Sequence, residues 1–531
     1  MTLLIAAALA EIPAGETIDE AVAVQVTPAG FENVGAFLPA LAPEQTYVDD
    51  TSDAQGWECL NYAYSIENMW VGVDINDTRI LPGNGVLDVE VDLEVHVNGA
   101  LDPFQLYFEA FCGGTDCPGY IKPFPVTVLT DIALDVVEVN GVRTLDATIG
   151  DITYDNGLEN SHISLDCGLQ DLENLLQIFG LSFYDLIIGA VEGQLDSQLA
   201  DLKTTLEETI ESTFADLSIE QELDLQGSVV QLAVAPYDVD ITPDGLTLIM
   251  QGSANAEPAD CIAEWDAGTS PSTEGAVPDA SSLTSDIGIL VGDDFTNQLL
   301  YAVWRGGLLC QVIDEDLFPL DSGILGLLTG GVFDELFPVD EVQPVFIATY
   351  PKQPLTADFT GAHDIDIPVR ELEIAFFSEV DGRTARIVSL DASLDPGVDL
   401  VFNGTTGELE VDLDIGADEM GAVTAFNEFA PGREAEIEEA FLGSIGGILD
   451  TALGAALPEL SFGLPAFEGV GLTSLVASGT DQWLTLGAGL GEVPYEAGSC
   501  EDGCSGGCAS GPVGAGVWAM LALGVSVRRR G

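Results

Sequence analysis

The chain has 531 residues, and its 90 Asp and Glu residues against 13 Lys and Arg residues give a formal net charge of −77 at pH 7. Because nucleic-acid affinity depends on Lys and Arg contacts to phosphates, this charge excludes a nucleic-acid partner. Hydrophobic residues make up 47 % of the chain, so the acidic groups belong to a folded, apolar body rather than a disordered one. The charge either keeps the protein soluble or collects divalent cations, and the composition leaves both open.

The first residues, "MTLLIAAALAEIPAG", contain an apolar run that ends in Ala8, Leu9 and Ala10. Small residues in this pattern are typical of a signal-peptidase site, although the basic residues that usually precede the apolar run are missing. We therefore expect residues 1–10 to be a signal peptide and the protein to be exported, either to the cell surface or into the medium.

Much of the body alternates between apolar and polar residues. In "VLDVEVDLEVHVNG", Leu87 and the apolar residues that follow it at every second position fall on one face, with acidic residues on the other. The segment "GELEVDLDIG" repeats the pattern. This alternation predicts antiparallel strands with one buried face and one acidic, solvated face. Asp412 and Asp414 have the spacing of a calcium loop but lack the glycine and glutamate that complete one.

Two segments instead have apolar residues at steps of three and four, which predicts long amphipathic helices over 183–217 and 433–457. The stripe of the first helix consists of Ile187, Val191, Leu195, Leu199, Leu202, Leu206 and Ile210. The stripe of the second consists of Ile437, Phe441, Ile445 and Leu449. Each stripe suits either a protein core or the wall of an apolar channel, and periodicity does not separate the two.

The segment "DDFTNQLLYAVWRGGLLCQVID", which begins at Asp293, predicts a shorter helix. We expect Asp293 or Asp294 to cap its start and the glycine pair at 306–307 to end it. Its apolar side would consist of Phe295, Leu299, Val303 and Trp304.

A stretch rich in Ser, Thr, Pro and Gly, "DAGTSPSTEGAVPDASSLTSD", divides the body and predicts a linker at 261–285. The segments on either side, 11–260 and 286–492, both show strands, then a long helix, then strands. We therefore expect two domains of duplicated architecture.

Nine cysteines are present, and six of them lie in the body. An even number in an exported chain predicts disulfides, although six cysteines allow fifteen pairings. The pairing we expect joins neighbours across a tight loop and otherwise stays within each half: Cys112–Cys117, Cys59–Cys167 and Cys261–Cys310. A zinc site is the alternative, but no histidine accompanies these cysteines at ligand spacing.

Residues 493–531 hold a Cys- and Gly-rich spacer, an apolar stretch over 511–527 and a closing arginine cluster. This order resembles the MYXO-CTERM sorting tails of Gram-negative bacteria. The resemblance implies cleavage by a sorting protease near the cysteines and retention at the cell surface or outer membrane; a plain membrane anchor is the alternative. The residues concerned are Cys500, Cys504, Cys508, Arg528, Arg529 and Arg530.

The order of elements also resembles the tubular lipid-binding (TULIP) superfamily. The matching features are the entry "VQVTPAGFENVGAFL", its counterpart "VGDDFTNQLLYAVWRGGLL", the two long helices and the closing strands up to residue 491. The resemblance implies an α+β fold with two tandem barrels, each a curved antiparallel sheet wrapped around a long amphipathic helix. It implies apolar grooves that hold acyl chains, with the stripe residues named above as lipid contacts, and a phospholipid or neutral lipid and a membrane surface as partners.

The chain departs from that family in its charge. Members that bind lipopolysaccharide use a basic tip, whereas Arg79, Lys122, Arg143 and Lys203 are scattered through the N-terminal half. This departure puts endotoxin binding in doubt and favours neutral or zwitterionic lipids, or contact through bridging Ca²⁺.

The motifs of catalysis are missing. There is no G-x-S-x-G elbow and no phosphate-binding G-x-x-x-x-G-K-[ST] loop, and the histidines at 96, 162 and 363 are far apart in the sequence. We therefore expect a lipid-binding or lipid-transfer protein without catalytic activity, without a dedicated metal site and without a cofactor other than, at most, Ca²⁺. The alternative is an acidic, calcium-binding, β-rich surface or adhesion protein that has no lipid channel.

Overall fold

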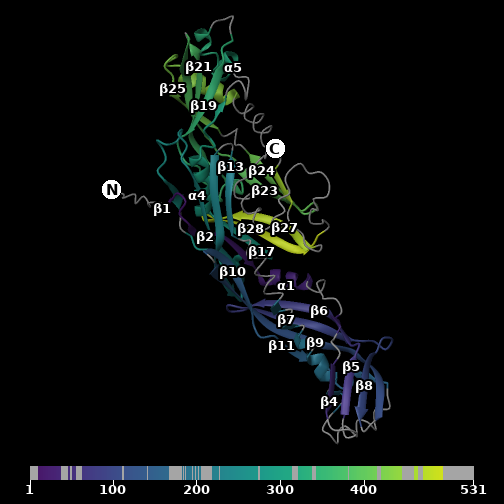
Figure 1. Ribbon diagram of the computed structural model, residues 1–531. Helices are drawn as coiled ribbons and strands as arrows, with labels where there is room; N and C mark the ends of the chain where they lie inside the picture. The colour runs from purple at the N-terminus through teal and green to yellow at the C-terminus, as the bar shows by residue number, and fades with distance from the viewer. Residues whose placement is uncertain are drawn as a thin grey trace.

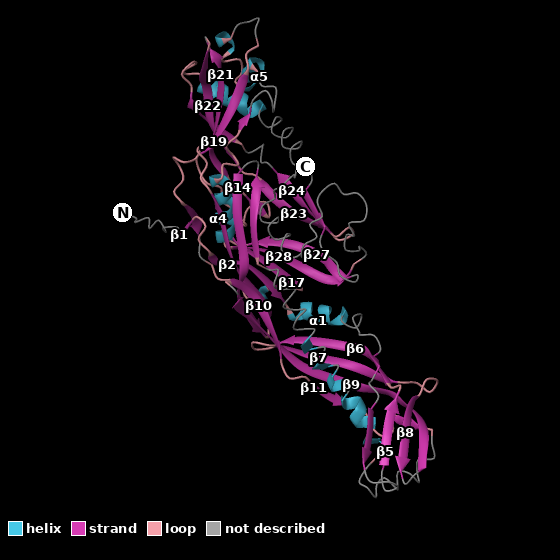
Figure 2. Ribbon diagram, viewed as in Figure 1, coloured by secondary structure: helices cyan, strands magenta, loops and turns pink. Residues whose placement is uncertain are grey.

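The computed structural model describes the chain from residue 10 to residue 493, with gaps. The described residues are 10–37, 46–47, 51–55, 62–110, 113–139, 141–166, parts of 182–204, 218–225, 228–272, 275–313, 321–337, 342–380, 382–414, 420–444, 460–463 and 470–493. Most of this structure is antiparallel strand, as Figure 2 shows, with a few helices packed beside the sheets. The coarse expectation of an α+β fold built on antiparallel sheets is confirmed.

The molecule is elongated, with a large sheet near each end and a third between them (Figure 1). The sheet at the N-terminal end is ordered β3-β6-β7-β9-β8-β5-β4, and β10, β11 and β12 also pair with the long strand β9. Its strands are β3 (Thr46–Tyr47), β4 (Thr51–Gln55), β5 (Tyr62–Glu67), β6 (Trp70–Pro82), β7 (Leu87–Val97), β8 (Phe104–Ala110), β9 (Gly113–Val139), β10 (Val142–Ile149), β11 (Thr153–Asn156) and β12 (Ile163–Leu165).

The period-two pattern of β7 has the predicted consequence. Leu87, Val95 and Val97 are buried, whereas Asp88 is exposed, because successive side chains of a strand point to opposite faces. Helix α1 (Pro28–Phe37) packs on β6, where Gly35 lies so close to the Thr78 carbonyl that a side chain would collide with it. In β7 the acidic residues therefore lie on the face opposite Leu87, Val95 and Val97.

The central sheet is built from both halves of the chain. It is ordered β13-β14-β15-β2-β17-β28-β27. Its strands are β2 (Ile18–Val26), β13 (Ile219–Leu225), β14 (Ser228–Thr242), β15 (Gly245–Ala256), β17 (Ile287–Gly292), β27 (Val470–Gly479) and β28 (Trp483–Glu492). Strand β2 pairs with β15 on one side and β17 on the other, so the two halves meet in one continuous ladder of hydrogen bonds.

The segment 261–285, expected as a linker, is packed into this arrangement. It contains β16 (Thr269–Ser272), which pairs with β1 (Ala10–Pro13), and the 3₁₀ helix η3 (Ala280–Ser282). Ile262 is fully buried, and the Trp483 indole donates a hydrogen bond to the carbonyl oxygen of Ala276 at 3.0 Å. Although its composition is typical of a loop, burial and hydrogen bonds fix the segment in place.

The rest of the C-terminal half contains two further sheets, ordered β18-β19-β21-β22-β25 and β20-β23-β24-β26. We call the first of these, with the helices packed on it, the distal lobe. The elements are β18 (Val312–Ile313), α5 (Ser322–Leu328), η4 (Asp334–Leu336), β19 (Val345–Pro351), β20 (Ile365–Asp366), β21 (Val369–Val380), β22 (Arg383–Leu394), β23 (Gly397–Asn403), β24 (Glu408–Asp414), β25 (Gly421–Phe426) and β26 (Leu460–Gly463).

Helix α4 (Asp293–Arg305) ends as predicted, with Gly306 as C-cap and Gly307 at φ +84°, a value that favours glycine. Its start differs from the prediction: Gly292 is the N-cap, and no side chain caps the helix. Asp293 and Asp294 instead lie in the first turn, where negative charge suits the helix dipole, and the Asp294 carboxylate accepts a hydrogen bond from Ser272.

The two long predicted helices are described in part. The described residues between 184 and 204 are helical, as are residues 434–444, and the remainder of both segments lies outside the described residues. Two tandem barrels, each around a long helix, therefore stay a prediction. Residues 1–9 of the expected signal peptide over 1–10 and the tail after 493 also lie outside the described residues, while Ala10 begins β1. None of the described helices has the length and apolarity that crossing a bilayer requires.

Candidate functional site

The described stripe residues of the first long helix lie in a packed interior. Ile187 and Val191 are fully buried and Leu195 almost so, in one apolar cluster with side chains of the N-terminal sheet such as Phe124. Leu199 packs against the edge of this cluster. The remaining members of the predicted stripe, Leu202, Leu206 and Ile210, lie outside the described residues.

The described residues of the second stripe are also buried. Ile437 and Phe441 are fully buried in the distal lobe, where the Phe441 ring meets Phe376 edge-on with 6.4 Å between ring centroids. Ile445 and Leu449 lie outside the described residues.

The apolar side of α4 is buried as well. Phe295, Leu299 and Val303 pack into one cluster with β14 and β15, and Trp304 is fully buried with its indole donating to the Pro351 carbonyl oxygen at 2.8 Å. Every described stripe residue thus contacts the interior of the protein itself. Their contact with lipid stays a prediction.

The end of α4 is fixed by a disulfide and a charge cluster. Cys261 and Cys310 form the predicted disulfide. Cys117 is also disulfide-bonded, while Cys59, Cys112 and Cys167 lie outside the described residues, as do Cys500, Cys504 and Cys508 and the three closing arginines.

Beside that disulfide, the Asp266 carboxylate accepts hydrogen bonds from the Tyr301 hydroxyl and from Arg305 Nε, the latter at 3.0 Å. Burial alone would raise the pKa of Asp266, but these bonds and one from the Gly268 amide hold it below its ordinary value. Burial and the bond to Asp266 raise the pKa of Tyr301 to about 12. The cluster anchors the end of the helix to the segment before it.

The boundary between strands β10 and β14 has the features of a ligand-binding site. The ends of β9 and β10 contact β14, yet β10 pairs only with β9, and β14 pairs only with β13 and β15. We call this boundary the seam. Among the described residues no backbone hydrogen bond joins β10 to β14. Apolar side chains close the seam from inside: Leu134, Val136 and Leu145 share one cluster with Val234, Val239 and Ile219.

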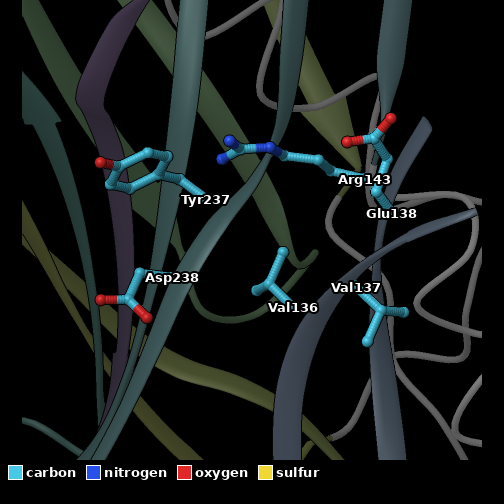
Figure 3. Close-up of a pocket in the computed structure, with 6 residues that line it drawn as sticks. All are labelled: Val136, Val137, Glu138, Arg143, Tyr237 and Asp238. Atoms are coloured by element: carbon cyan, nitrogen blue, oxygen red, sulfur yellow. The ribbon is translucent and has the colours of Figure 1, made fainter. Parts of the chain in front are cut away.

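A cavity of about 410 Å³, the seam pocket, opens at this boundary (Figure 3). It is lined by Val136, Val137, Glu138, Arg143, Tyr237 and Asp238. An adjoining pocket of about 250 Å³ shares Glu138 and Arg143 with it, and its other lining residues include Val234 and Ile219 of the apolar cluster. Both pockets therefore border the apolar cluster that closes the seam.

The backbone of β14 explains why Tyr237 lines the pocket. The register between β14 and β15 shifts between Pro236 and Asp238, which leaves Tyr237 out of the ladder. A proline cannot donate to a ladder, and a bulge re-aims the side chain beside it. The Tyr237 ring lies under Arg143, with 5.1 Å from the guanidinium carbon to the ring centroid. A hydrogen bond to Asp19, and then the charge of Asp19, raise the pKa of Tyr237.

Arg143 is held by its backbone, since its carbonyl oxygen accepts a hydrogen bond from Ser218 Oγ at 2.7 Å. Glu138 is its cross-strand partner, yet within the described part of the chain the Arg143 guanidinium forms no salt bridge. Sequence reasoning noted Arg143 only as a scattered cation. The signal available was the scarcity of cations, but nothing local connects residues 143 and 237.

A second cluster lies on the outer face of the N-terminal sheet. One ligand atom each of Asp74, Glu94 and His96 lies within 4.8 Å of the others, and His96 Nε2 is 2.7 Å from an Asp74 oxygen. Asp74 and Glu94 are cross-strand partners, with His96 two residues further along the same face. Such a group can bind a divalent cation, although its histidine is a softer ligand than Ca²⁺ prefers.

Comparison with known proteins gives structural neighbours only. No protein-family model and no curated protein matches the chain. The crystal structure of lipopolysaccharide binding protein is 12 % identical, with a TM-score of 0.47 over 90 % of this chain and 100 % of that chain. P47 of Clostridium botulinum E1 is 9 % identical, with a TM-score of 0.25 over 89 % and 100 % of the two chains.

Takeout 1 of Epiphyas postvittana is 9 % identical, with a TM-score of 0.19 over 32 % of this chain and 88 % of that chain. These structures have TULIP-type folds, the fold that the sequence resembles. At such identities and TM-scores, the likeness establishes neither a family nor a function for this chain.

Proposed function

We propose that the protein binds lipid and takes acyl chains into the apolar interior behind the seam. The observation that carries this proposal is the seam itself. Only side chains close the apolar cluster there, and two pockets border that cluster. Each methylene that leaves water contributes about 0.8 kcal/mol, so two acyl chains supply ample affinity with few polar contacts.

The construction of the seam gives acyl chains a way in. Opening a ladder would break backbone hydrogen bonds worth about 0.5–1.5 kcal/mol each. Parting β10 from β14 breaks none among the described residues, although it loses the Ser218 hydroxyl bond and the contact between Arg143 and the Tyr237 ring. One backbone hydrogen bond, from the Gly85 amide to the Ile241 carbonyl oxygen, joins the two sheets at the turn between β6 and β7. The strands can separate while both sheets keep their pairing.

In the same proposal the protein is exported, held at the cell surface and transfers lipid to or from a membrane, without catalysing a reaction. The apolar run before residue 11 and the cysteine, apolar and arginine segments after residue 493 support this location. Protease treatment of intact cells that express the full chain tests it: an exported, surface-held protein is degraded, and a chain that stays protected inside the cell contradicts it.

Lipid binding is tested by loading the purified full chain from phosphatidylcholine vesicles and measuring bound lipid by native mass spectrometry. We expect Val137→Trp, which places an indole in the seam pocket, to lower the amount of bound lipid about tenfold. Val229→Trp is the matched control, because Val229 lies on β14 at an exposed position outside both pockets. A wild-type protein that stays free of lipid, or two variants that bind equally, would contradict the seam as the entrance.

A calcium-binding surface protein is the second candidate, and the cluster of Asp74, Glu94 and His96 favours it. Its expected signature is a thermal midpoint that rises with CaCl₂ in the wild type and not in Asp74→Asn, combined with no uptake of lipid. A midpoint that does not depend on calcium removes this candidate.

A further inference from the structure

Arg143 presents an unused hydrogen-bonding edge to the seam pocket. The guanidinium carbon lies 5.1 Å from the centroid of the Tyr237 ring, a cation–π contact that uses none of the N–H groups in a salt bridge. Within the described part of the chain no carboxylate forms a salt bridge with it. A guanidinium edge of this kind matches two oxygen atoms of a phosphate with two parallel hydrogen bonds.

Carboxylates surround this single cation. Glu138 and Asp238 line the same pocket; in Figure 3 Arg143 lies between Tyr237 and Glu138, and Asp238 lies below Tyr237. Glu220 lines the adjoining pocket, and Asp19 holds the Tyr237 hydroxyl. Negative charges outnumber positive ones here, and the whole chain carries −77. A ligand with only negative charge is therefore repelled, whereas one that adds a positive group is attracted.

We propose that the seam pocket binds a zwitterionic group, with phosphodiester oxygens on the Arg143 guanidinium and an ammonium group beside the carboxylates of Glu138 and Asp238. The inference rests on the proposed function for the source of this group, a phospholipid headgroup whose acyl chains pass through the seam. A free choline or ethanolamine phosphodiester carries the same chemistry, and the experiment separates the two sources.

The experiment loads the full chain from vesicles of dioleoyl phosphatidylcholine, phosphatidylethanolamine or phosphatidylglycerol, which share their acyl chains and differ in headgroup. Bound lipid is counted by mass spectrometry. We expect the two zwitterionic lipids to be bound about tenfold more than the anionic one, and Arg143→Gln to lower their binding about tenfold, because a bidentate charge-assisted contact is lost. Arg143→Lys recovers only part of the binding, since an ammonium lacks the fork geometry.

Arg383→Gln is the matched control, because it removes the same charge from an exposed arginine of the distal lobe, far along the chain from the pocket. Arg143→Gln keeps the fold, since Ser218 bonds the Arg143 backbone and not its side chain. Unchanged thermal midpoints check this. Equal binding of all three lipids, or wild-type binding by Arg143→Gln, overturns the headgroup site and leaves lipid binding intact.

A calorimetric titration with soluble glycerophosphocholine tests the headgroup site independently of lipid uptake. If no lipid of any class is bound, the proposed function fails, and the pocket is judged on this titration alone. Heat of binding that disappears in Arg143→Gln then supports a site for a free zwitterion. No heat in the wild type, together with no lipid binding, overturns the pocket as a ligand site.

Discussion

In the distal lobe Lys352 lies 2.6 Å from Asp391 and 3.2 Å from Glu373, whereas Arg143 at the seam has no salt-bridge partner among the described residues. Glu373 also pairs with Arg386, and it is only 12 % exposed. Both regions place a cation at the surface of a sheet, in a chain that has an excess of carboxylates. Lys352 and Arg386 thus share the Glu373 carboxylate, whereas the guanidinium of Arg143 contacts the Tyr237 ring instead.

The largest effect we expect comes from removing the carboxylate that Lys352 and Arg386 share. Glu373→Gln leaves Lys352 and Arg386 without a shared carboxylate in a poorly solvated place, and we expect it to lower the free energy of unfolding by about 3 kcal/mol. Denaturant titration measures this. Glu379→Gln, an exposed change on the same strand β21, is the control and should cost under about 0.5 kcal/mol. Equal effects of the two changes would show that the network does not stabilise the lobe.

A second prediction uses Tyr301, whose pKa is raised to about 12 by burial and by Asp266. Between pH 10 and about 12 the unfolded chain loses this proton before the folded one does, so stability falls as the pH rises through this range. The expected loss approaches about 2–3 kcal/mol near pH 12, and about 1.3 kcal/mol of it falls between pH 9 and pH 11. Comparing unfolding of wild type and Tyr301→Phe at pH 9 and pH 11 isolates it, because the phenylalanine variant cannot ionise. A variant with the same pH dependence as the wild type would contradict the prediction.

The smallest effect concerns His363, which lies 2.9 Å from Asp399 and 3.7 Å from Asp414. The hydrogen bond to Asp399 is the main cause that raises the pKa of His363 above 6.5, and the same bond lowers the pKa of Asp399. The stabilisation from His363 is complete below about pH 6.5 and is lost as the pH rises through its raised pKa. The stabilisation from Asp399 is lost as the pH falls through its lowered pKa.

Because these side chains are 24 % and 43 % exposed, we expect the pair to contribute under about 1 kcal/mol. Unfolding of wild type and His363→Gln at pH 6 and pH 9 measures it. The difference in free energy of unfolding between the two proteins should shrink at pH 9. A difference that grows there would contradict the conclusion that protonated His363 stabilises the fold.

Local patterns predicted the elements well where neighbouring residues decide the outcome. The alternation in β7, the end of α4 at Gly306 and the burial of Ile187 and Phe441 all follow from residues within a few positions of one another. The disulfide between Cys261 and Cys310, which are 49 residues apart, was predicted by pairing cysteines within each half of the chain. The start of α4 was not predicted correctly, because Asp294 bonds Ser272, which β16 brings beside the helix.

The candidate site could not be predicted, because its residues come from strands that are distant in the sequence. Arg143 lies on β10 and Tyr237 on β14, and the two meet only because both sheets fold against one apolar cluster. A lone arginine and a proline inside a strand are common features, so neither pointed to a pocket.

The sequence by itself determined which residues turn inward, because the period of two in strands and the steps of three and four in helices fix the apolar face of each element. It also determined the surplus of negative charge that disfavours anionic ligands. The tertiary structure alone decided that β2 joins the two halves, that the segment 261–285 is packed, and that an arginine without a salt bridge among the described residues lines a cavity. These features depend on which distant strands pair and on where two sheets fail to pair, and neither is encoded in any short stretch of the chain.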